Sequence, residues 1–339
     1  MEPLRIAIIG AGYWGKNLVR VALAAPEARL IAVCDRRPEA LAAVQRGAPH
    51  VRVETDAAAV FDAPDVDAVL IATPVTTHAA LCRAALAAGK HVWVEKPMTA
   101  TVQEAEELVT LAASRGRVLH VDHTFLYTPA VRRLKELVTA GDLGVIRYLD
   151  SERINLGLIQ PDVDVIADLA AHDLSIFQYL LGVMPERVSA LGSAYVTRKT
   201  SSPRSEVAHL LLRYPNDIVA HVHASWLSPV KIRKMLVGGS RKMVAYDDIA
   251  PIEKVKVYDH GVDVDLTGET TFEPVYRSGD VVIPWLGNKE ALVQELEEFV
   301  AAARGGAPTL TDAQFGLDVV RIIAAAQRSI AAGGAPESP

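Results

Sequence analysis

The most constraining feature of this sequence is a glycine-rich turn that directly follows its first apolar strand. The stretch RIAIIGAGYWGKNLV places Gly10, Gly12 and Gly15 between a strand-like run and a helical run. In this setting the first glycine permits a tight turn, the second lets the backbone approach a pyrophosphate, and the third lets the helix pack closely on the strand. The turn also contains Tyr13 and Trp14. It would direct the N–H groups of the helix N-terminus at the phosphates, and it predicts a dinucleotide-binding unit.

An acidic residue stands where such a unit needs one. Asp35 ends the second predicted strand, twenty residues beyond Gly15. A carboxylate there can accept hydrogen bonds from an adenosine ribose and would repel a 2′-phosphate, which favours NAD as the cofactor. Arg36 and Arg37 follow at once and could hold that phosphate, so NADP remains an alternative.

The pattern of apolar residues divides the chain into two domains and a tail. Up to about residue 120, near-continuous apolar strands alternate with alanine-rich helical stretches. This alternation predicts a Rossmann-type, doubly wound α/β domain with a parallel sheet over residues 1–122. Strand patterns between about residues 188 and 282, flanked by helices, predict an α+β domain with an open, mostly antiparallel sheet over residues 123–332. Residues 333–339 are expected to be a frayed tail.

Two other strand ends in the first domain carry polar residues. The run HVWV ends in Glu95, Lys96 and a proline, and the segment IATPVTTH brings Thr73, Pro74 and His78 to the end of another strand. Such sheets bind ligands at the carboxyl ends of their strands, so Thr73 and Pro74 are candidates to border the ribose and nicotinamide. His78 is equally compatible with capping the next helix. A lysine at a strand exit is most often only a solvated charge.

The segments GAGYWG, IATPVTTH, VEKP and DLAAHD, in this order, resemble the Gfo/Idh/MocA family of oxidoreductases over nearly the whole chain. The resemblance implies oxidation of sugar or polyol hydroxyls, or reduction of the ketones, with NAD(P). It places Lys96 beside substrate and nicotinamide, and it makes Asp168 and His172 the other catalytic residues. Family members often have glycine two residues after that carboxylate, where this chain has Ala170.

These three residue types suit the oxidation of an alcohol. A histidine titrates near neutral pH, so His172 would take the hydroxyl proton. Asp168 lies one helical turn earlier and could orient the imidazole or bind a neighbouring hydroxyl. Lys96 would stabilise negative charge that develops on the substrate oxygen, and Glu95 would position the strand end beside the cofactor. An exposed Asp and His on an amphipathic helix is the alternative interpretation.

Four further residues are weaker candidates for substrate binding. His123 and Tyr127 stand at the predicted crossover between the domains, and Arg153 and Asn155 alternate along one predicted strand and so share a face. A linker histidine, a core tyrosine and a solvated strand face are the corresponding structural alternatives.

The substrate class is suggested by two further features. The stretch HTFLYTPAV resembles family members that act on nucleotide-linked sugars, and Arg198, Lys199 and Arg204 form a basic loop that could meet a diphosphate. We therefore expect a nucleotide sugar, with inositol or another free polyol as the alternative. The alternative of another class is a non-catalytic sensor of NAD or sugar, which the presence of both Lys96 and His172 disfavours.

Composition excludes several other functions. The 339 residues carry a net charge of −6, which argues against general affinity for nucleic acid or an anionic membrane. No apolar run is long enough to span a bilayer, and Cys34 and Cys82 offer no disulfide framework, as expected of a cytoplasmic protein. His221 and His223 share a strand face but have no further ligands at workable spacing, so no metal is expected. An open sheet needs cover, which predicts a homodimer or homotetramer.

Overall fold

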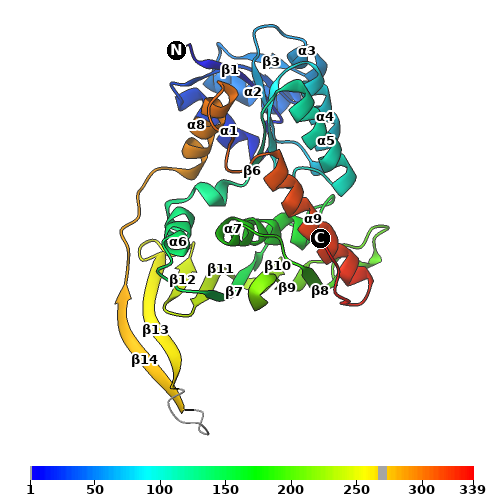
Figure 1. Cartoon of the computed structure of the whole chain (residues 1–339). Coiled ribbons are helices and arrows are strands. Elements are labelled where there is room, and N and C mark those ends of the chain that lie inside the picture. Colours follow the sequence, from blue (N-terminus) through cyan, green and yellow to red (C-terminus); the bar gives the residue numbers. More distant parts are fainter. Residues whose placement is uncertain (1, 266–272) are drawn as a thin grey trace. The chain divides into compact units, whose positions relative to one another are not determined.

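The computed structural model describes residues 2–265 and 273–339 and divides into two compact units. Unit 1 comprises Met1–Tyr127 and Lys289–Arg321, and unit 2 comprises Thr128–Asn288 and Ile322–Pro339. The expected α/β architecture, with a parallel sheet followed by a mostly antiparallel one, is confirmed (Figure 1).

Unit 1 is built on a six-stranded parallel sheet with the order β3-β2-β1-β4-β5-β6. The order reverses direction at β1, so the strands on its two sides are reached by crossovers in opposite directions, which is the doubly wound arrangement. The strands are β1 (Leu4–Ile9), β2 (Ala28–Cys34), β3 (Arg52–Glu54), β4 (Ala68–Ile71), β5 (His91–Glu95) and β6 (Leu119–Asp122).

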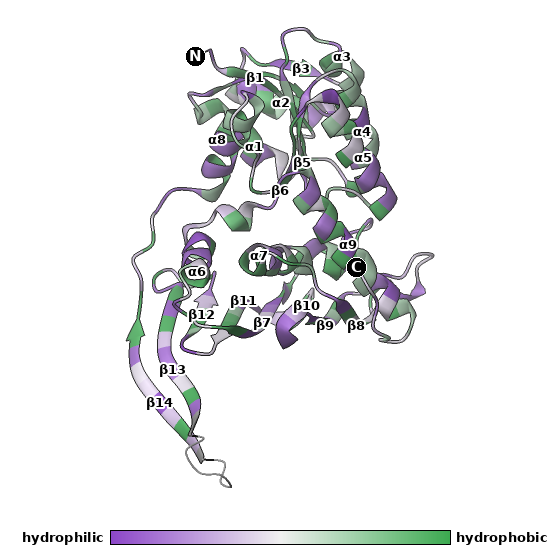
Figure 2. Ribbon diagram, in the orientation of Figure 1, coloured by the Kyte–Doolittle hydropathy of each residue, from purple (hydrophilic) through white to green (hydrophobic). Residues whose placement is uncertain are grey.

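Helices cover both faces of this sheet, which explains why its strands are apolar throughout. Along β1, Ile6 and Ile8 belong to one core while Ala7 and Ile9 belong to the other. In Figure 1, α1 and α8 lie on one side of the sheet and α4 and α5 on the other. The helices of this unit are α1 (Gly15–Ala24), α2 (Pro38–Gly47), α3 (Ala57–Phe61), α4 (Val75–Ala87), α5 (Val102–Arg115) and α8 (Ala291–Ala303), together with the 3₁₀ turn η1 (Thr124–Tyr127). Both polar and apolar residues appear along these helices in Figure 2, as expected of amphipathic helices on a core.

The domain boundaries differ from those predicted. The first unit continues to Tyr127 instead of ending at residue 122, and it also includes Lys289–Arg321. The reason is that Leu292, Leu296 and Phe299 of α8 pack into the core on the α1 side of the sheet. A sequence pattern shows that α8 is amphipathic but not which sheet it covers.

Unit 2 is built on an eight-stranded sheet with the order β14-β13-β12-β11-β7-β10-β9-β8. Each neighbouring pair is antiparallel except β7 and β10, which run parallel. The predicted strand region is confirmed apart from residues 266–272, which lie outside the described part of the chain. The strands are β7 (Ile146–Leu156), β8 (Arg187–Ser193), β9 (Val207–Arg213), β10 (Val219–Ser225), β11 (Leu227–Gly239), β12 (Met243–Asp247), β13 (Val255–Asp265) and β14 (Glu273–Val282).

One face of this second sheet is covered by helices (Figure 1). These are α6 (Pro129–Thr139), α7 (Ala171–Leu181), which continues a π-helical turn η2 (Ile166–Ala170), and the later part of α9 (Ala313–Ala331). Strand β9 shows the consequence, because Leu210 and Leu212 are buried while Leu211 between them is 55% exposed. The sheet therefore keeps an apolar residue on its other face.

The last residues are not the separate tail that was predicted. Glu337 pairs with Val188 of β8 in an antiparallel bridge, and its carboxylate accepts a 3.2 Å hydrogen bond from Arg328 of α9. These contacts dock the segment on unit 2. Among the described residues, no helix has the length and apolar character needed to cross a bilayer.

Candidate active site

The glycine turn has the geometry that a dinucleotide requires. Gly10 has φ +98°, and a Cβ on it would lie 2.4 Å from the Ala72 carbonyl oxygen. A Cβ on Gly15 would lie 1.9 Å from the Gly10 carbonyl oxygen, whereas one on Gly12 would meet no atom closer than 3.6 Å. The first and last glycines are thus needed by the fold, and Gly12 leaves space beside the backbone. Helix α1 begins at Gly15, and the Tyr13 ring before it is 88% exposed.

Asp35 follows β2 and is bound to the glycine turn. Its Oδ2 accepts a 2.8 Å hydrogen bond from the Ala11 N–H, and both carboxylate oxygens accept from the Arg37 guanidinium at 2.9–3.0 Å. The hydrogen bonds from Arg37 lower the pKa of Asp35 to about 2 even though burial acts to raise it. Arg36 is exposed. An ionised carboxylate thus stands where the adenosine ribose was predicted to bind.

His78 connects two of the predicted strand ends. It lies in the first turn of α4 and is buried, and its ring nitrogens face two backbone carbonyls, Thr73 O at 2.8 Å and Pro97 O at 3.0 Å. The Thr73 hydroxyl is 2.7 Å from that of Thr77, and Pro74 stands just before α4. His78 therefore connects the turn after β4 to the turn after Lys96. This role differs from simple capping of α4.

Lys96 stands directly after β5 and is half-buried. The peptide bond between Lys96 and Pro97 is cis. The Glu95 side chain before it has a buried Oε1. Burial first, and then the charge of Asp122 and a hydrogen bond to it, raise the pKa of Glu95 well above its usual range, while the Lys96 charge acts in the opposite direction. Glu95 is therefore a neutral neighbour of the lysine.

Asp122 is a residue that the sequence reasoning missed. It ends β6, is buried, and pairs in register with Glu95 of β5. Its Oδ2 accepts a 2.9 Å hydrogen bond from the indole N–H of Trp14 in the glycine turn, and its Oδ1 accepts from the Thr124 hydroxyl. In the sequence, the position of an acidic residue at the end of an apolar strand could have marked Asp122 as a site residue. That position does not indicate Trp14 or Thr124 as its partners.

The two crossover candidates differ in what surrounds them. His123 is buried with an edge-on contact to Phe315, and within the described residues neither of its ring nitrogens has a hydrogen-bond partner. Burial lowers the pKa of His123 to about 3, so the ring is neutral. Tyr127 is also buried, but its hydroxyl contacts Glu298 at 3.0 Å and Thr311 at 3.3 Å. Tyr127 is therefore a core residue of unit 1, which corrects its assignment to the substrate.

In unit 2, Asp168 and His172 occupy the junction between two kinds of helix. Asp168 lies in the π-helical turn η2, and His172 is the second residue of α7. The Asp168 Oδ2 accepts a 2.9 Å hydrogen bond from the indole N–H of the buried Trp226, which follows β10. The predicted pair is thus half-buried on one helix, and Trp226 is the partner that sequence reasoning did not identify.

Arg153 does not form the predicted wall of a polar pocket. It is 2% exposed, and its guanidinium donates to both carboxylate oxygens of Asp173, at 2.6 Å and 3.2 Å. Ser151 donates to the same carboxylate at 2.7 Å. Arg153 therefore ties β7 to α7, because a buried guanidinium needs a carboxylate. Asn155, two residues further along β7, is half-buried, and its role stays a prediction.

Three histidines lie close together on the unit 2 sheet. His209 stacks on His223 at 4.2 Å and on His221 at 5.9 Å, and His221 contacts Asp150. Nevertheless, within the ranges that the structure describes, no three such side chains are arranged to hold a metal ion. Arg198 and Lys199 are exposed, and Arg204 donates to the Pro161 carbonyl.

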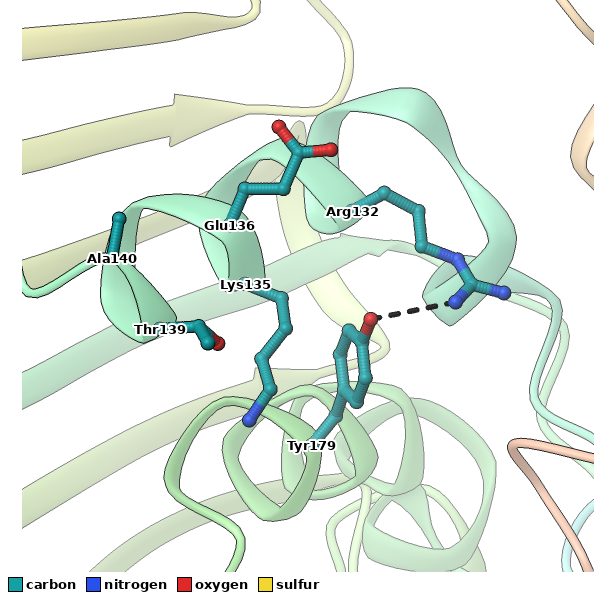
Figure 3. A pocket seen from close by; sticks show the side chains of 6 residues that line it. All are labelled: Arg132, Lys135, Glu136, Thr139, Ala140 and Tyr179. Atoms are coloured by element: carbon teal, nitrogen blue, oxygen red, sulfur yellow. Dashed lines mark hydrogen bonds between the residues drawn. The ribbon is translucent and has the colours of Figure 1, made fainter.

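A surface groove of about 530 Å³ lies between α6 and α7 (Figure 3). Lys135 lies over the Tyr179 ring, 5.3 Å from its centroid, and donates to the Leu180 carbonyl at 3.2 Å, near the end of α7. Its ammonium therefore stabilises a helix C-terminus. The groove contains none of the predicted site residues; its lining is Arg132, Lys135, Glu136, Thr139, Ala140 and Tyr179.

The chain matches known proteins along most of its length. Residues 4–123 match the model of an oxidoreductase family with an NAD-binding Rossmann fold, and residues 131–245 match the GFO/IDH/MocA C-terminal domain. A curated relative, UDP-N-acetylglucosamine 3-dehydrogenase of Acidithiobacillus ferrooxidans, is 31% identical over 96% of each chain. The chain belongs to the GFO/IDH/MocA oxidoreductase family. It is therefore an NAD-binding oxidoreductase, as its glycine turn and motifs predicted.

Other members of the GFO/IDH/MocA family extend this comparison. A solved structure of the UDP-N-acetylglucosamine 3-dehydrogenase from Acidithiobacillus ferrooxidans has a TM-score of 0.80 and 28% identity, covering 98% of this chain and 99% of that one. Inositol 2-dehydrogenase of Rhizobium meliloti is 24% identical over 97% of each chain. Full-length members with two different kinds of substrate are thus similar to this chain.

Proposed function

We propose that this oxidoreductase transfers hydride between NAD and a hydroxyl or ketone carbon of a sugar carried by a nucleoside diphosphate. The observation that carries the proposal is the full-length similarity to a UDP-N-acetylglucosamine 3-dehydrogenase, combined with the retention of Lys96, Asp168 and His172. A dTDP-sugar 3-reductase from Streptomyces antibioticus, 32% identical over 65% of this chain, supports the same substrate class.

We propose that three side chains act in the same reaction. The bound dinucleotide would accept the hydride from the alcohol carbon. His172 would take the hydroxyl proton as general base. Lys96 would donate a hydrogen bond to the oxygen from which that proton departs and would stabilise its negative charge. Asp168, held by the Trp226 indole, would orient the imidazole or bind a neighbouring hydroxyl.

The cofactor contacts follow from the glycine turn and the strand ends of unit 1. The N-terminus of α1 and the open space at Gly12 suit a pyrophosphate. Asp35 would accept hydrogen bonds from the adenosine ribose, which favours NAD over NADP. Tyr13, Thr73 and Pro74 would border the ribose and nicotinamide.

Less direct support exists for the assignment of four further residues to substrate or cofactor binding. The unpaired ring nitrogens of His123 support a contact with substrate or nicotinamide. Asn155 and the basic loop of Arg198 and Lys199 remain candidates for the sugar and the diphosphate, respectively.

A substrate panel tests the proposal directly. The protein would be incubated with NAD and, separately, with UDP-N-acetylglucosamine, a dTDP-hexose, myo-inositol and free hexoses, and NADH formation would be followed by absorbance. We expect turnover of a nucleotide sugar and binding of UDP or dTDP to the NAD complex in the micromolar to millimolar range. Turnover of inositol, with no binding of either nucleotide at millimolar concentration, would instead establish the polyol dehydrogenase that the Rhizobium meliloti relative suggests.

We also propose that the protein is a cytoplasmic homo-oligomer. Its two thiols, Cys34 and Cys82, are buried and free, and burial raises the pKa of each, which suits a reducing compartment. Apolar residues on the helix-free face of the unit 2 sheet support self-association. Three of them, Leu191, Leu211 and Leu236, are 44–63% exposed.

A further inference from the structure

Three segments of unit 1 that are far apart in sequence meet at one buried carboxylate. Trp14 comes from the glycine turn, Glu95 from the end of β5, and Asp122 from the end of β6. The Trp14 indole N–H lies 2.9 Å from the Asp122 Oδ2, and Glu95 and Asp122 are register partners on adjacent strands. Asp122 therefore contacts both the cofactor turn and the residue next to Lys96.

The contacts of Asp122 favour its ionised form. Trp14 and Thr124 both donate to it, and the indole N–H of Trp14 can only donate. Burial acts to raise its pKa, but hydrogen bonds from Glu95, Thr124 and Trp14 lower it. Glu95 supplies its hydrogen bond as a neutral carboxylic acid. The Asp122 carboxylate thus accepts from both the Trp14 indole and the Thr124 hydroxyl, and such donors are what a buried charge needs.

We infer that Asp122 is a positioning residue that holds the Trp14 indole of the cofactor turn and the Glu95 carboxyl beside Lys96 in fixed relation to each other. The hydrogen bond to Trp14 would orient the turn in which Tyr13 and Gly12 meet the dinucleotide. The contact with Glu95 would fix the strand end that presents Lys96. The first effect rests only on the NAD-binding fold, and the second rests on the catalytic role proposed for Lys96.

Alternative structural explanations are weaker. A buried acid that served only the stability of the sheet could pair within β5 and β6, and it would not need a donor 108 residues away in the glycine turn. Trp14 is half-buried and packs beside the core of the α1 face, so its indole could pack there without reaching Asp122. The hydrogen bond instead joins the glycine turn, which would bind the dinucleotide, to the strand ends beside Lys96.

The test measures NADH affinity and turnover in four variants: Trp14→Phe, Asp122→Asn, the double variant, and Trp285→Phe as the matched control. Trp285 is 87% exposed and lies outside both the glycine turn and the strand ends. NADH dissociation constants would be determined by nucleotide fluorescence without substrate. A hydrogen bond to a charged group is worth roughly ten- to a hundredfold in an equilibrium constant. Because this bond acts on NADH only through the position of the turn, we expect part of that effect, a loss of NADH affinity of about five- to twentyfold. We expect this loss in each single variant and no change with Trp285→Phe.

The double variant and the turnover number decide between positioning and stability. If Asp122 acts through Trp14, the double variant should bind NADH no more weakly than the worse single variant. Asp122→Asn should also lower kcat at saturating NAD about tenfold, whereas Trp14→Phe should change it less than threefold. Multiplicative losses in the double variant would overturn the inference. So would a lowered melting temperature in Asp122→Asn with NADH affinity within twofold of wild type.

A second variant covers the case in which Asp122→Asn does not fold. Thr124→Val removes only the donor to the Asp122 Oδ1, and we expect a three- to tenfold loss of NADH affinity. Unchanged affinity in a folded Thr124→Val protein, together with unchanged affinity in Trp14→Phe, would contradict the inference. Because the NADH-affinity measurements need no substrate, a failed substrate panel would leave that part of the test decisive.

Discussion

At the residue scale, the chemistry depends on a few charges whose surroundings differ sharply. Lys96 directly follows Glu95, and burial and the Asp122 charge raise the pKa of Glu95 well above its usual range. Asp35 is held ionised by Arg37. His172 is half-buried on the first turn of α7. Two substitutions test the roles proposed for the first two.

Lys96→Met should reduce kcat at least about a hundredfold, because it removes the group that stabilises negative charge on the substrate oxygen. NADH affinity should change little, since the pyrophosphate and ribose contacts lie elsewhere. Steady-state kinetics and NADH titration would check both expectations. The exposed Lys231→Met serves as the control and should behave like wild type. A kcat within about threefold of wild type for Lys96→Met would exclude a catalytic role.

Asp35→Ser should narrow or reverse a preference for NAD. The substitution removes the ionised carboxylate that would repel a 2′-phosphate, and it releases the Arg37 guanidinium from its two hydrogen bonds to Asp35. The ratio of kcat/KM for NAD and NADP measures the effect. Arg37→Ala in the Asp35→Ser background should remove most of the gain with NADP. A wild-type protein that already prefers NADP would show that Asp35 has another role.

At the element scale, the pairing of β6 with α8 buries ionisable groups in their neutral forms. His120 of β6 lies 3.0 Å from Glu295 of α8, and both side chains are inaccessible to solvent. Burial lowers the pKa of His120 to about 3. Burial, and then the charge of Asp122, raise the pKa of Glu295 well above its usual range. The two shifts have opposite consequences for stability as the pH changes.

Glu295→Gln should stabilise the protein more at pH 8.5 than at pH 6.5. Above about pH 4.5 the unfolded chain releases the Glu295 proton while the folded chain keeps it, so wild-type stability falls as the pH rises, by at most about 1.4 kcal/mol per pH unit. His120 opposes this only between its folded pKa of about 3 and its unfolded value of 6.5, where stability rises with pH. Glu295→Gln removes the Glu295 contribution to the pH dependence of the free energy of unfolding and leaves the contributions of the other groups unchanged.

Urea unfolding at the two pH values would measure this difference. The exposed Glu107→Gln on α5 is the matched control, and its effect should not depend on pH in this range. An equal effect of Glu295→Gln at both pH values would show that Glu295 is ionised in the folded protein.

At the scale of the whole molecule, the unit 2 sheet leaves apolar side chains on the face opposite α6, α7 and α9, which carries no helix in the described part of the chain. Leu211 is the clearest case, because it lies in the middle of β9 between Ser189 of β8 and His221 of β10. A large sheet that exposes several leucines on one face is expected to associate with another copy. A charge in the middle of that face would oppose this association.

Leu211→Glu should reduce the oligomeric mass seen by light scattering, from a dimer or tetramer toward the monomer, with an unchanged circular dichroism spectrum. The control is Leu23→Glu, which adds the same charge at an exposed leucine of α1 and should leave the mass unchanged. A wild-type protein that is monomeric at micromolar concentration would contradict the proposed assembly.

The sequence by itself determined the features that depend on local backbone needs. Only glycine fits at positions 10 and 15, where a Cβ would collide with the Ala72 or Gly10 carbonyl. The spacing of apolar residues likewise indicates which segments form strands and which form helices. The family motifs, with Lys96, Asp168 and His172, could be recognised for the same reason, since each is a short stretch with fixed spacing.

Only the tertiary structure decided which distant residues meet. It joined Trp14 to Asp122, Trp226 to Asp168, and Arg153 to Asp173, and it returned α8 to the first sheet. It also moved Tyr127 and Arg153 from the predicted substrate site into the core. These pairings depend on burial, because a polar group removed from water must find a partner within reach, and that partner is set by the packing of whole elements and not by neighbouring residues in the chain.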